Sequence, residues 1–158
     1  MLPERVEKPW RDLKAYIEAR RIEALAEAKL AVRLLAEGYT RNAAGKAFQA
    51  FKSLLAVLAG ERREELARGL PMVDKLIAYM STSAVRNIAK VLGLEGEAII
   101  ALALHQYQYN GSDPEGVMSI YSSRDDAIRD MCSLLTRIAE ILNDEGLKTE
   151  LHNTCPRH

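Results

Sequence analysis

The most informative segment of the chain is EGEAIIALALHQYQY, which occupies residues 95–109. Seven consecutive apolar residues run from Ala98 to Leu104, and the segment contains no proline. A helix of this composition is apolar nearly all round, which is typical of the buried centre of a domain. We therefore expect a helix over 95–109 at the centre of a helical protein.

The composition of the whole chain points to the same class of fold. Alanine and leucine contribute 22 and 21 of the 158 residues, whereas valine and threonine together contribute 12. Strong helix formers so far ahead of β-branched residues predict an all-α protein. The 22 basic and 22 acidic side chains cancel. This balance excludes a general nucleic-acid coat or a basic membrane-surface protein, although a local basic face remains compatible with it.

Glycines and capping residues divide the remaining sequence into further helices. Gly38 ends a first long helix, and Thr40 is expected to cap a second that Gly60 ends. We expect five to seven helices, two or three of them long. Helical segments are indicated over residues 9–37, 40–59, 61–68, 72–80, 83–92, 95–109 and from Ser122 or Ser123 through Leu142, and Ser81 or Ser83 would cap the fifth. A turn starts at Asn110, and Asp113-Pro114 would open a short helix after it.

The chain reads as one helical domain over residues 1–146, followed by a mobile tail over 147–158 that lacks an apolar period. Two cysteines, Cys132 and Cys155, do not make the disulfide framework of a secreted protein. With neither a signal peptide nor a membrane span evident, we expect a cytoplasmic protein. The tail residues His152, Cys155 and His158 lack a second pair of ligands, so we expect no metal and no cofactor.

A helix-turn-helix pattern spans Ala89, Gly93 and Ile99, with a glycine four residues after the small residue and an aliphatic residue six further on. The second helix would have to present Arg, Lys, Asn or Gln to base edges. It begins instead with Glu95, Gly96 and Glu97, whose carboxylates would be repelled by phosphates. A structural helical corner therefore explains the pattern better than DNA binding, and we expect DNA to be an improbable partner.

His105, Tyr107 and Tyr109 are the candidate binding residues. The histidine could transfer a proton, and a nearby tyrosine could orient it or bind a phosphate. The simpler interpretation is a core histidine with tyrosines that fill the interior and reach water. We assign no catalytic residue.

Charge is unevenly distributed along the chain. Residues 41–68 contain six basic and three acidic side chains, whereas residues 95–126 contain one basic and six acidic side chains. This polarity suits a self-complementary contact or a modest anion-binding face, although an ordinary solvated surface would also explain it.

The order of these segments resembles the archaeal PaREP family of small helical proteins over residues 15–143, and that family is itself similar to the wider HEPN superfamily. The resemblance rests on an alanine-rich second helix with Lys46 and Lys52, on the string from Leu104 to Gly111, on Tyr121, and on the amphipathic helix from Arg124. It implies an antiparallel helical bundle of HEPN type, often dimeric, from a hyperthermophilic archaeon. It lends no activity, because none is established for the PaREP family.

Many HEPN proteins are metal-independent ribonucleases in which four to six residues separate an arginine from a following histidine. His105 and Tyr107 match the second half of that motif, but the arginine position falls on residues 98–100, which are Ala, Ile and Ile. Arg86 lies 19 residues before His105, which is too far along the chain to replace it. A ribonuclease would therefore need an arginine from elsewhere, such as Arg41 or Arg124.

From these observations we expect a non-catalytic helical interaction or ligand-binding domain. It would form a homodimer and bind a protein, a nucleotide or RNA. The first alternative is an unusual HEPN-type ribonuclease that uses His105, and the second is a helix-turn-helix DNA-binding regulator.

Overall fold

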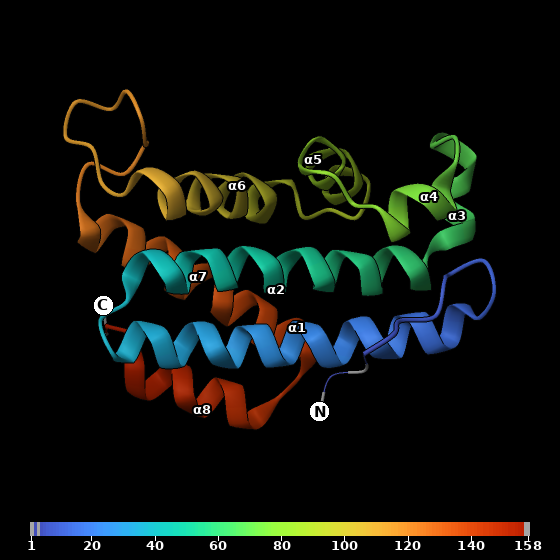
Figure 1. The fold of residues 1–158 in the computed structure, drawn as a ribbon, viewed down its shortest axis with the longest axis horizontal. Coiled ribbons are helices and arrows are strands. Elements are labelled where there is room, and N and C mark those ends of the chain that lie inside the picture. The colour runs from blue at the N-terminus through green and yellow to red at the C-terminus, as the bar shows by residue number, and fades with distance from the viewer. Residues whose placement is uncertain (1, 3, 157–158) are drawn as a thin grey trace.

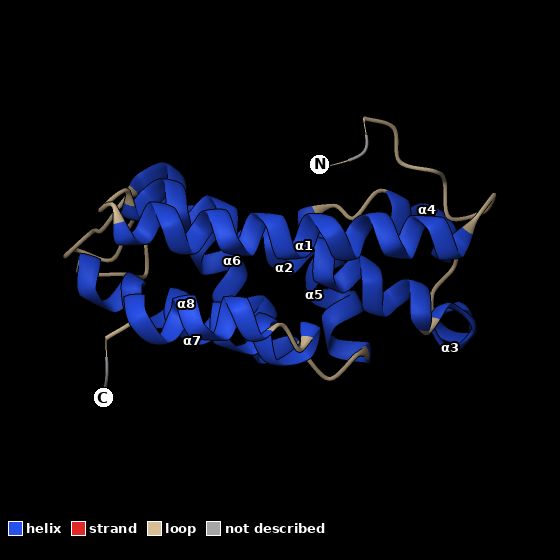
Figure 2. Cartoon of the chain, turned by 90° about the horizontal axis from the view of Figure 1, so that it is seen from below, coloured by secondary structure: helices blue, strands red, loops and turns tan. Residues whose placement is uncertain are grey.

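The computed structural model describes residue 2 and residues 4–156, and all the regular secondary structure in that part of the chain is helical (Figures 1 and 2). The all-α prediction is therefore confirmed. The described helices are α1 (Leu13–Ala36), α2 (Thr40–Glu61), α3 (Arg63–Gly69), α4 (Val73–Ala78), α5 (Thr82–Val91), α6 (Glu95–Asn110), α7 (Arg124–Leu142) and α8 (Glu145–Thr154). The expected number of five to seven helices was too low, since the described residues form eight.

Helices α1 and α2 form an αα-hairpin that runs the length of the molecule (Figure 1). The Asp12 carboxylate caps α1 by accepting a hydrogen bond from the amide of Ala15 at 3.0 Å. Gly38 follows the helix with φ at +89°, a left-handed conformation that glycine adopts without the steric cost other residues incur. The chain can therefore reverse within three residues, and α2 returns along α1.

Helix α2, and not α6, is the central helix. Fourteen of its 22 residues are buried, and it packs against α1 and α6 on either side and against α7 (Figure 1). Its alanines allow these neighbours to approach closely. The prediction that α6 lies at the buried centre was wrong. Only a stripe at three-residue spacing is buried on α6, comprising Ala98, Ala101, Leu104 and Tyr107, whereas Ile99 is 47% exposed.

The serine caps are confirmed, but two other expected helix starts are wrong. Ser81 caps α5 and Ser123 caps α7, each accepting a backbone N–H three residues further on. The N-cap of α2 is Tyr39, and Thr40 is already helical. Residues after Pro114 form no helix, because the Asp113 carboxylate binds the amides of residues 115, 117 and 118 and closes a compact loop instead.

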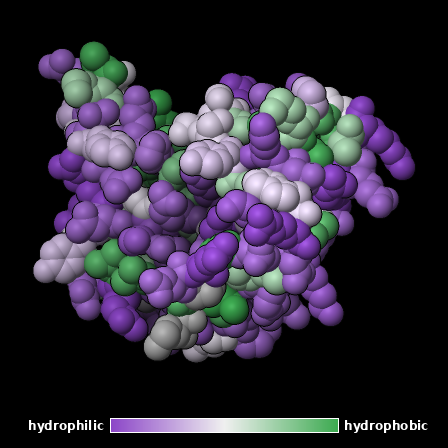
Figure 3. Space-filling view, turned by 45° about the vertical axis from the view of Figure 1, so that its right-hand side comes forward, coloured by the Kyte–Doolittle hydropathy of each residue, from purple (hydrophilic) through white to green (hydrophobic). Residues whose placement is uncertain are grey.

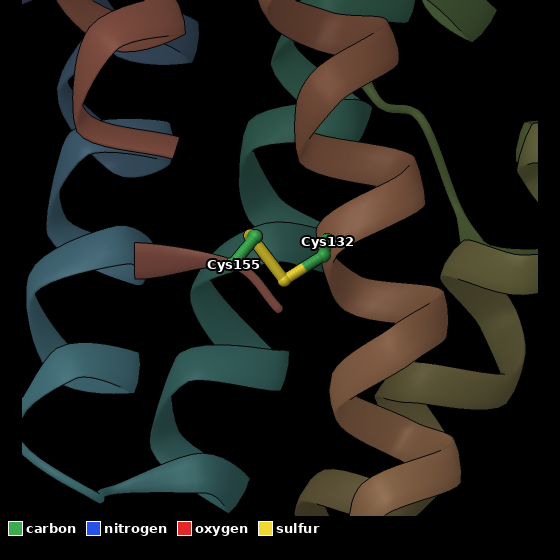
Figure 4. The surroundings of a disulfide bond; sticks show 2 residues. All are labelled: Cys132 and Cys155. Carbon is green, nitrogen blue, oxygen red and sulfur yellow. A yellow bond between two sulfur atoms is a disulfide. The ribbon is translucent and has the colours of Figure 1, made fainter. Parts of the chain in front are cut away.

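Residues 145–154 form helix α8, where a tail was expected. Asp144 caps this helix, and Leu147 and Leu151 are buried one turn apart against α1 and α7. Two leucines are too few to produce an apolar period in the sequence, which explains the error. A disulfide joins Cys132 of α7 to Cys155 at the end of α8, across a sequence separation of 23 (Figure 4). The last two residues of the expected tail, 157 and 158, lie outside the described residues.

One connected apolar core includes buried side chains from all eight helices. On the face drawn in Figure 3, apolar groups lie in small patches separated by hydrophilic side chains. Within the described residues, no helix combines the length and the apolarity needed to span a bilayer.

Candidate functional site

The three candidate residues of α6 do not form one site. His105 and Tyr109 are one helical turn apart on the same face, and the imidazole meets the Tyr109 ring edge to face with centroids 5.4 Å apart. Tyr107 is two residues from His105, which turns its side chain by about 200° around the helix axis. It therefore faces the opposite side of α6, where it packs against Tyr121.

His105 lies against α2 and is half-buried. Its ring stacks on Phe48 with centroids 4.2 Å apart, and its Nδ1 atom is buried without a hydrogen-bond partner. Burial lowers the pKa of the imidazole below its ordinary value, and the positive charge of Lys52 lowers the pKa further. The geometry therefore favours a neutral imidazole that no polar neighbour orients.

Arg41 and Arg124 could have completed a ribonuclease site, but they form hydrogen bonds at the end of α6 and at the start of α2. Arg41 donates from Nε to the carbonyl oxygen of Gln108 at 3.0 Å, and from Nη2 to the carbonyl oxygen of Tyr109. Arg124 donates from Nε to the Thr40 hydroxyl at 2.8 Å and from Nη2 to a backbone carbonyl at 3.2 Å. Among the described residues, no arginine forms a hydrogen bond with His105.

These arginines border a pocket of about 320 Å³ at the start of α2, lined by residues 38–42, Tyr107 and Arg124. Neither Arg41 nor Arg124 forms an ion pair with a carboxylate in the part of the chain that the structure describes. The pocket residues include no aspartate or glutamate. Two positive charges therefore remain uncompensated by carboxylates in a chain whose total charge is zero.

Tyr107 is a buried residue whose hydroxyl borders this pocket. The residue is 3% exposed, yet its hydroxyl makes no hydrogen bond to any described residue. Burial raises the pKa of Tyr107, while the charges of Arg124 and Arg41 oppose that rise. The phenol therefore remains a neutral donor at physiological pH, and nothing within the described protein accepts its proton.

The beginning of α2 adds a further set of donors. No side chain caps this 22-residue helix, and its first turn contains no acidic residue. The first amides of any helix lack partners within the helix and carry the positive end of its dipole. In α2 these amides belong to residues that line the pocket.

Two of the larger depressions on the surface differ from this pocket in charge. A depression of about 500 Å³ contains Arg20 and Glu27, which are paired with Glu23 and Lys46 respectively. One of about 750 Å³ contains Arg137, which lies within ion-pair distance of two glutamates. Their guanidinium charges are largely neutralised by neighbouring carboxylates, so the pocket beside Tyr107 is the stronger candidate.

The helical corner between α5 and α6 forms where the glycine pattern predicts it, with Gly93 at a φ of +77°. The first turn of α6 carries Glu95 and Glu97. Glu95 lies 3.5 Å from Arg86, and Glu97 lies 3.8 Å from Arg137. Acidic side chains therefore occupy the helix end that a DNA-binding protein would direct at phosphates.

Sequence reasoning identified Tyr107, Arg41 and Arg124 individually but did not group them. Thr40 and Arg124, which are hydrogen-bonded, are 84 positions apart, and only the packing of α2 against α6 and α7 brings them together. The absence of acidic residues from the first turn of α2 is the one local signal that could have indicated this pocket.

Taken together, the fold and the pocket define a small helical protein built on a central alanine-rich helix, with a basic pocket where that helix begins. The chain belongs to the archaeal PaREP1/PaREP8 family, whose family model matches residues 19–132. The matched region contains every residue of the pocket and stops before α8. No curated protein and no solved structure gives a significant match.

Proposed function

We propose that the chain is a non-catalytic ligand-binding domain that binds a small anion in the pocket at the start of α2. The observation that carries this proposal is the hydroxyl of the buried residue Tyr107, which borders the pocket and has no hydrogen-bond partner among the described residues, beside two arginines that form no ion pair with a described carboxylate. The hydroxyl of a mostly buried tyrosine usually has a hydrogen-bond partner, which is a protein group, a water molecule or a ligand. An anion in the pocket would supply the missing acceptor.

The hydrogen bonds that hold the two arginines leave donors available. Each guanidinium has five N–H groups, and the bonds to carbonyl and hydroxyl oxygens use only two on each side chain. Those bonds also fix the orientation of the side chains before any ligand arrives. A preorganised site loses less conformational entropy on binding than a flexible one.

The composition of the pocket supports ligand binding without catalysis. Its lining residues include no histidine, cysteine, aspartate or glutamate, so the pocket itself lacks a side chain that acts as a general base near neutral pH. His105 lies on the other face of α6. The nucleotide or RNA ligand expected from the sequence would fit this proposal through its phosphate.

The proposal is tested by following backbone amide signals in NMR spectra while sulfate, citrate and phosphate are titrated separately. We expect at least one of these anions to shift the amides of residues 39–42, and Tyr107→Phe to weaken that effect. Tyr79→Phe provides a matched control, because Tyr79 is exposed and does not line the pocket. Absence of any saturable shift with all three anions would overturn the proposal.

We further propose that the domain acts as a cytoplasmic homodimer with a HEPN-type bundle, as the family resemblance implies. Three apolar side chains in the loop between α6 and α7 support a protein contact, since Val117, Met118 and Ile120 are 77%, 55% and 67% exposed. Light scattering after size exclusion is expected to give twice the monomer mass, and Ile120→Ser to reduce it; a monomeric wild type would contradict the assembly.

The disulfide is compatible with a cytoplasmic location, because intracellular proteins of hyperthermophilic archaea contain disulfides.

A further inference from the structure

We infer that the ligand of this pocket is a phosphate monoester of a compact molecule that carries a planar ring. The inference rests on the proposed anion-binding function and specifies the chemical class of the ligand. Three features of the pocket lead to it: its charge, the arrangement of its donors, and its size together with an exposed aromatic ring.

The charge of the pocket favours a dianion over a monoanion. Arg41 and Arg124 each carry a full positive charge, and the start of α2 adds the positive end of a helix dipole. No lining residue is acidic. A carboxylate or a phosphodiester would neutralise about half of this charge, whereas a phosphate monoester carries a charge of about −1.5 to −2 near neutral pH.

The donors come from three independent parts of the fold. The Tyr107 hydroxyl belongs to α6, the free amides belong to the first turn of α2, and the Arg124 guanidinium belongs to α7. A terminal phosphate has three unsubstituted oxygens that can accept from three directions, whereas a diester has two. The pocket therefore matches a phosphate at the end of a molecule better than one within a chain.

The size of the pocket calls for an organic group beyond the phosphate. Its volume of about 320 Å³ lies at the lower end of the range for small-molecule sites and exceeds what a single phosphate fills. Tyr39, which precedes α2, lines the pocket and is 56% exposed. Aromatic side chains stack favourably on planar rings, so Tyr39 is placed to contact the ring of a ligand whose phosphate lies at the helix end.

The experiment is calorimetric titration of the full chain with phenyl phosphate, phenyl sulfate and glycerol 3-phosphate at pH 7.5. Phenyl sulfate has the same ring with a single negative charge, and glycerol 3-phosphate has the same phosphate without the ring. We expect phenyl phosphate to bind about tenfold more tightly than phenyl sulfate, a difference of about 1.4 kcal/mol, because its second negative charge compensates the second arginine of the pocket. Glycerol 3-phosphate should bind several-fold more weakly than phenyl phosphate.

Two variants of pocket residues and one control outside the pocket assign these binding preferences to side chains. Tyr39→Ala should reduce the affinity for phenyl phosphate to that for glycerol 3-phosphate, whereas Tyr79→Ala should not change it, because Tyr79 is 87% exposed and lies outside the pocket. Tyr107→Phe should weaken both phosphates about tenfold while it leaves the fold intact.

The outcomes separate the ligand class from the proposed function. Equal binding of phenyl phosphate and phenyl sulfate, or binding of sulfate and citrate without binding of either phosphate ester, would overturn the ligand class and leave anion binding in place. Failure of every anion, including the inorganic ones, would overturn both.

Discussion

The rings of Tyr107 and Tyr121 meet edge to face, with centroids 5.7 Å apart and planes at 84°. Both residues are buried, at 3% and 4% exposure. Of the two hydroxyls, only that of Tyr121 has a partner among the residues that the structure describes, since it donates to the Asp130 carboxylate at 2.8 Å. Burial raises the pKa of Tyr121 far above its ordinary value, and Asp130 raises the pKa further. Two neighbouring phenols therefore differ in their bonding, with one hydroxyl bonded within the fold and the other bordering the pocket.

Replacing each tyrosine by phenylalanine should separate these roles. Tyr121→Phe removes a hydrogen bond to a charged group, so we expect it to lower the free energy of unfolding by about 1.5 kcal/mol. Tyr107→Phe removes a hydroxyl without a partner, and we expect no loss of stability or a slight gain. Urea denaturation of the free protein measures both values, and equal losses in the two variants would show that the Tyr107 hydroxyl also has a structural partner.

The second prediction concerns how the stability of the fold depends on pH through the pKa of His105. In the unfolded chain the imidazole takes up a proton near pH 6.5, whereas in the folded protein burial and Lys52 lower its pKa. The unfolded state therefore binds more protons between these two pKa values, and stability falls as the pH drops below about 6.5. His105→Gln should show a smaller loss between pH 7.5 and 5.5 in denaturation experiments. An identical loss in both proteins would contradict the lowered pKa.

A third prediction concerns ribonuclease activity. His105 stacks on Phe48 and forms no hydrogen bond with an arginine among the described residues, so the phosphate-binding half of a ribonuclease site is not beside it. We expect wild-type protein and His105→Ala to give the same background in a metal-free RNA cleavage assay. Cleavage by the wild type that His105→Ala abolishes would restore the enzyme hypothesis.

Local features of the fold could be predicted from the sequence, and features that depend on several segments could not. Ser81, Ser123 and Gly38 act within one helical turn, and each lies where its residue type predicts. The burial of α6 was overestimated because a run of apolar residues does not show that only one stripe meets a neighbour. The pocket beside Tyr107 could not be predicted, because its lining residues come from three helices and from the segment between α1 and α2, and Tyr107 alone looks like an ordinary core tyrosine in the sequence.

The disulfide between α7 and α8 makes a fourth prediction. Cys132 and Cys155 close a loop of 23 residues, and a link of this length stabilises a fold by about 3 kcal/mol, chiefly by restricting the unfolded chain. A reducing agent should lower the free energy of unfolding by about this amount and increase hydrogen exchange in α8. A double variant with both cysteines replaced by alanine controls for other effects of the reductant, which should leave its stability unchanged. No response in the wild type would mean that the link contributes nothing.

The close approach of α1 to α2 makes the last prediction, through two helical glycines in different surroundings. A Cβ atom added at Gly60 would lie 2.7 Å from Cγ1 of Ile17, a half-buried side chain whose Cγ1 is bonded directly to its Cβ and moves only when the side chain changes rotamer, whereas a Cβ at Gly96 would meet nothing within 4 Å. Alanine is the better helix former by about 1 kcal/mol, so Gly96→Ala should stabilise the protein by up to this amount. Gly60→Ala should destabilise it by about 1–3 kcal/mol, because overpacking outweighs the gain in helix propensity. Thermal and urea denaturation of the two variants measure the difference, and stabilisation by both would show that α1 and α2 can separate without cost.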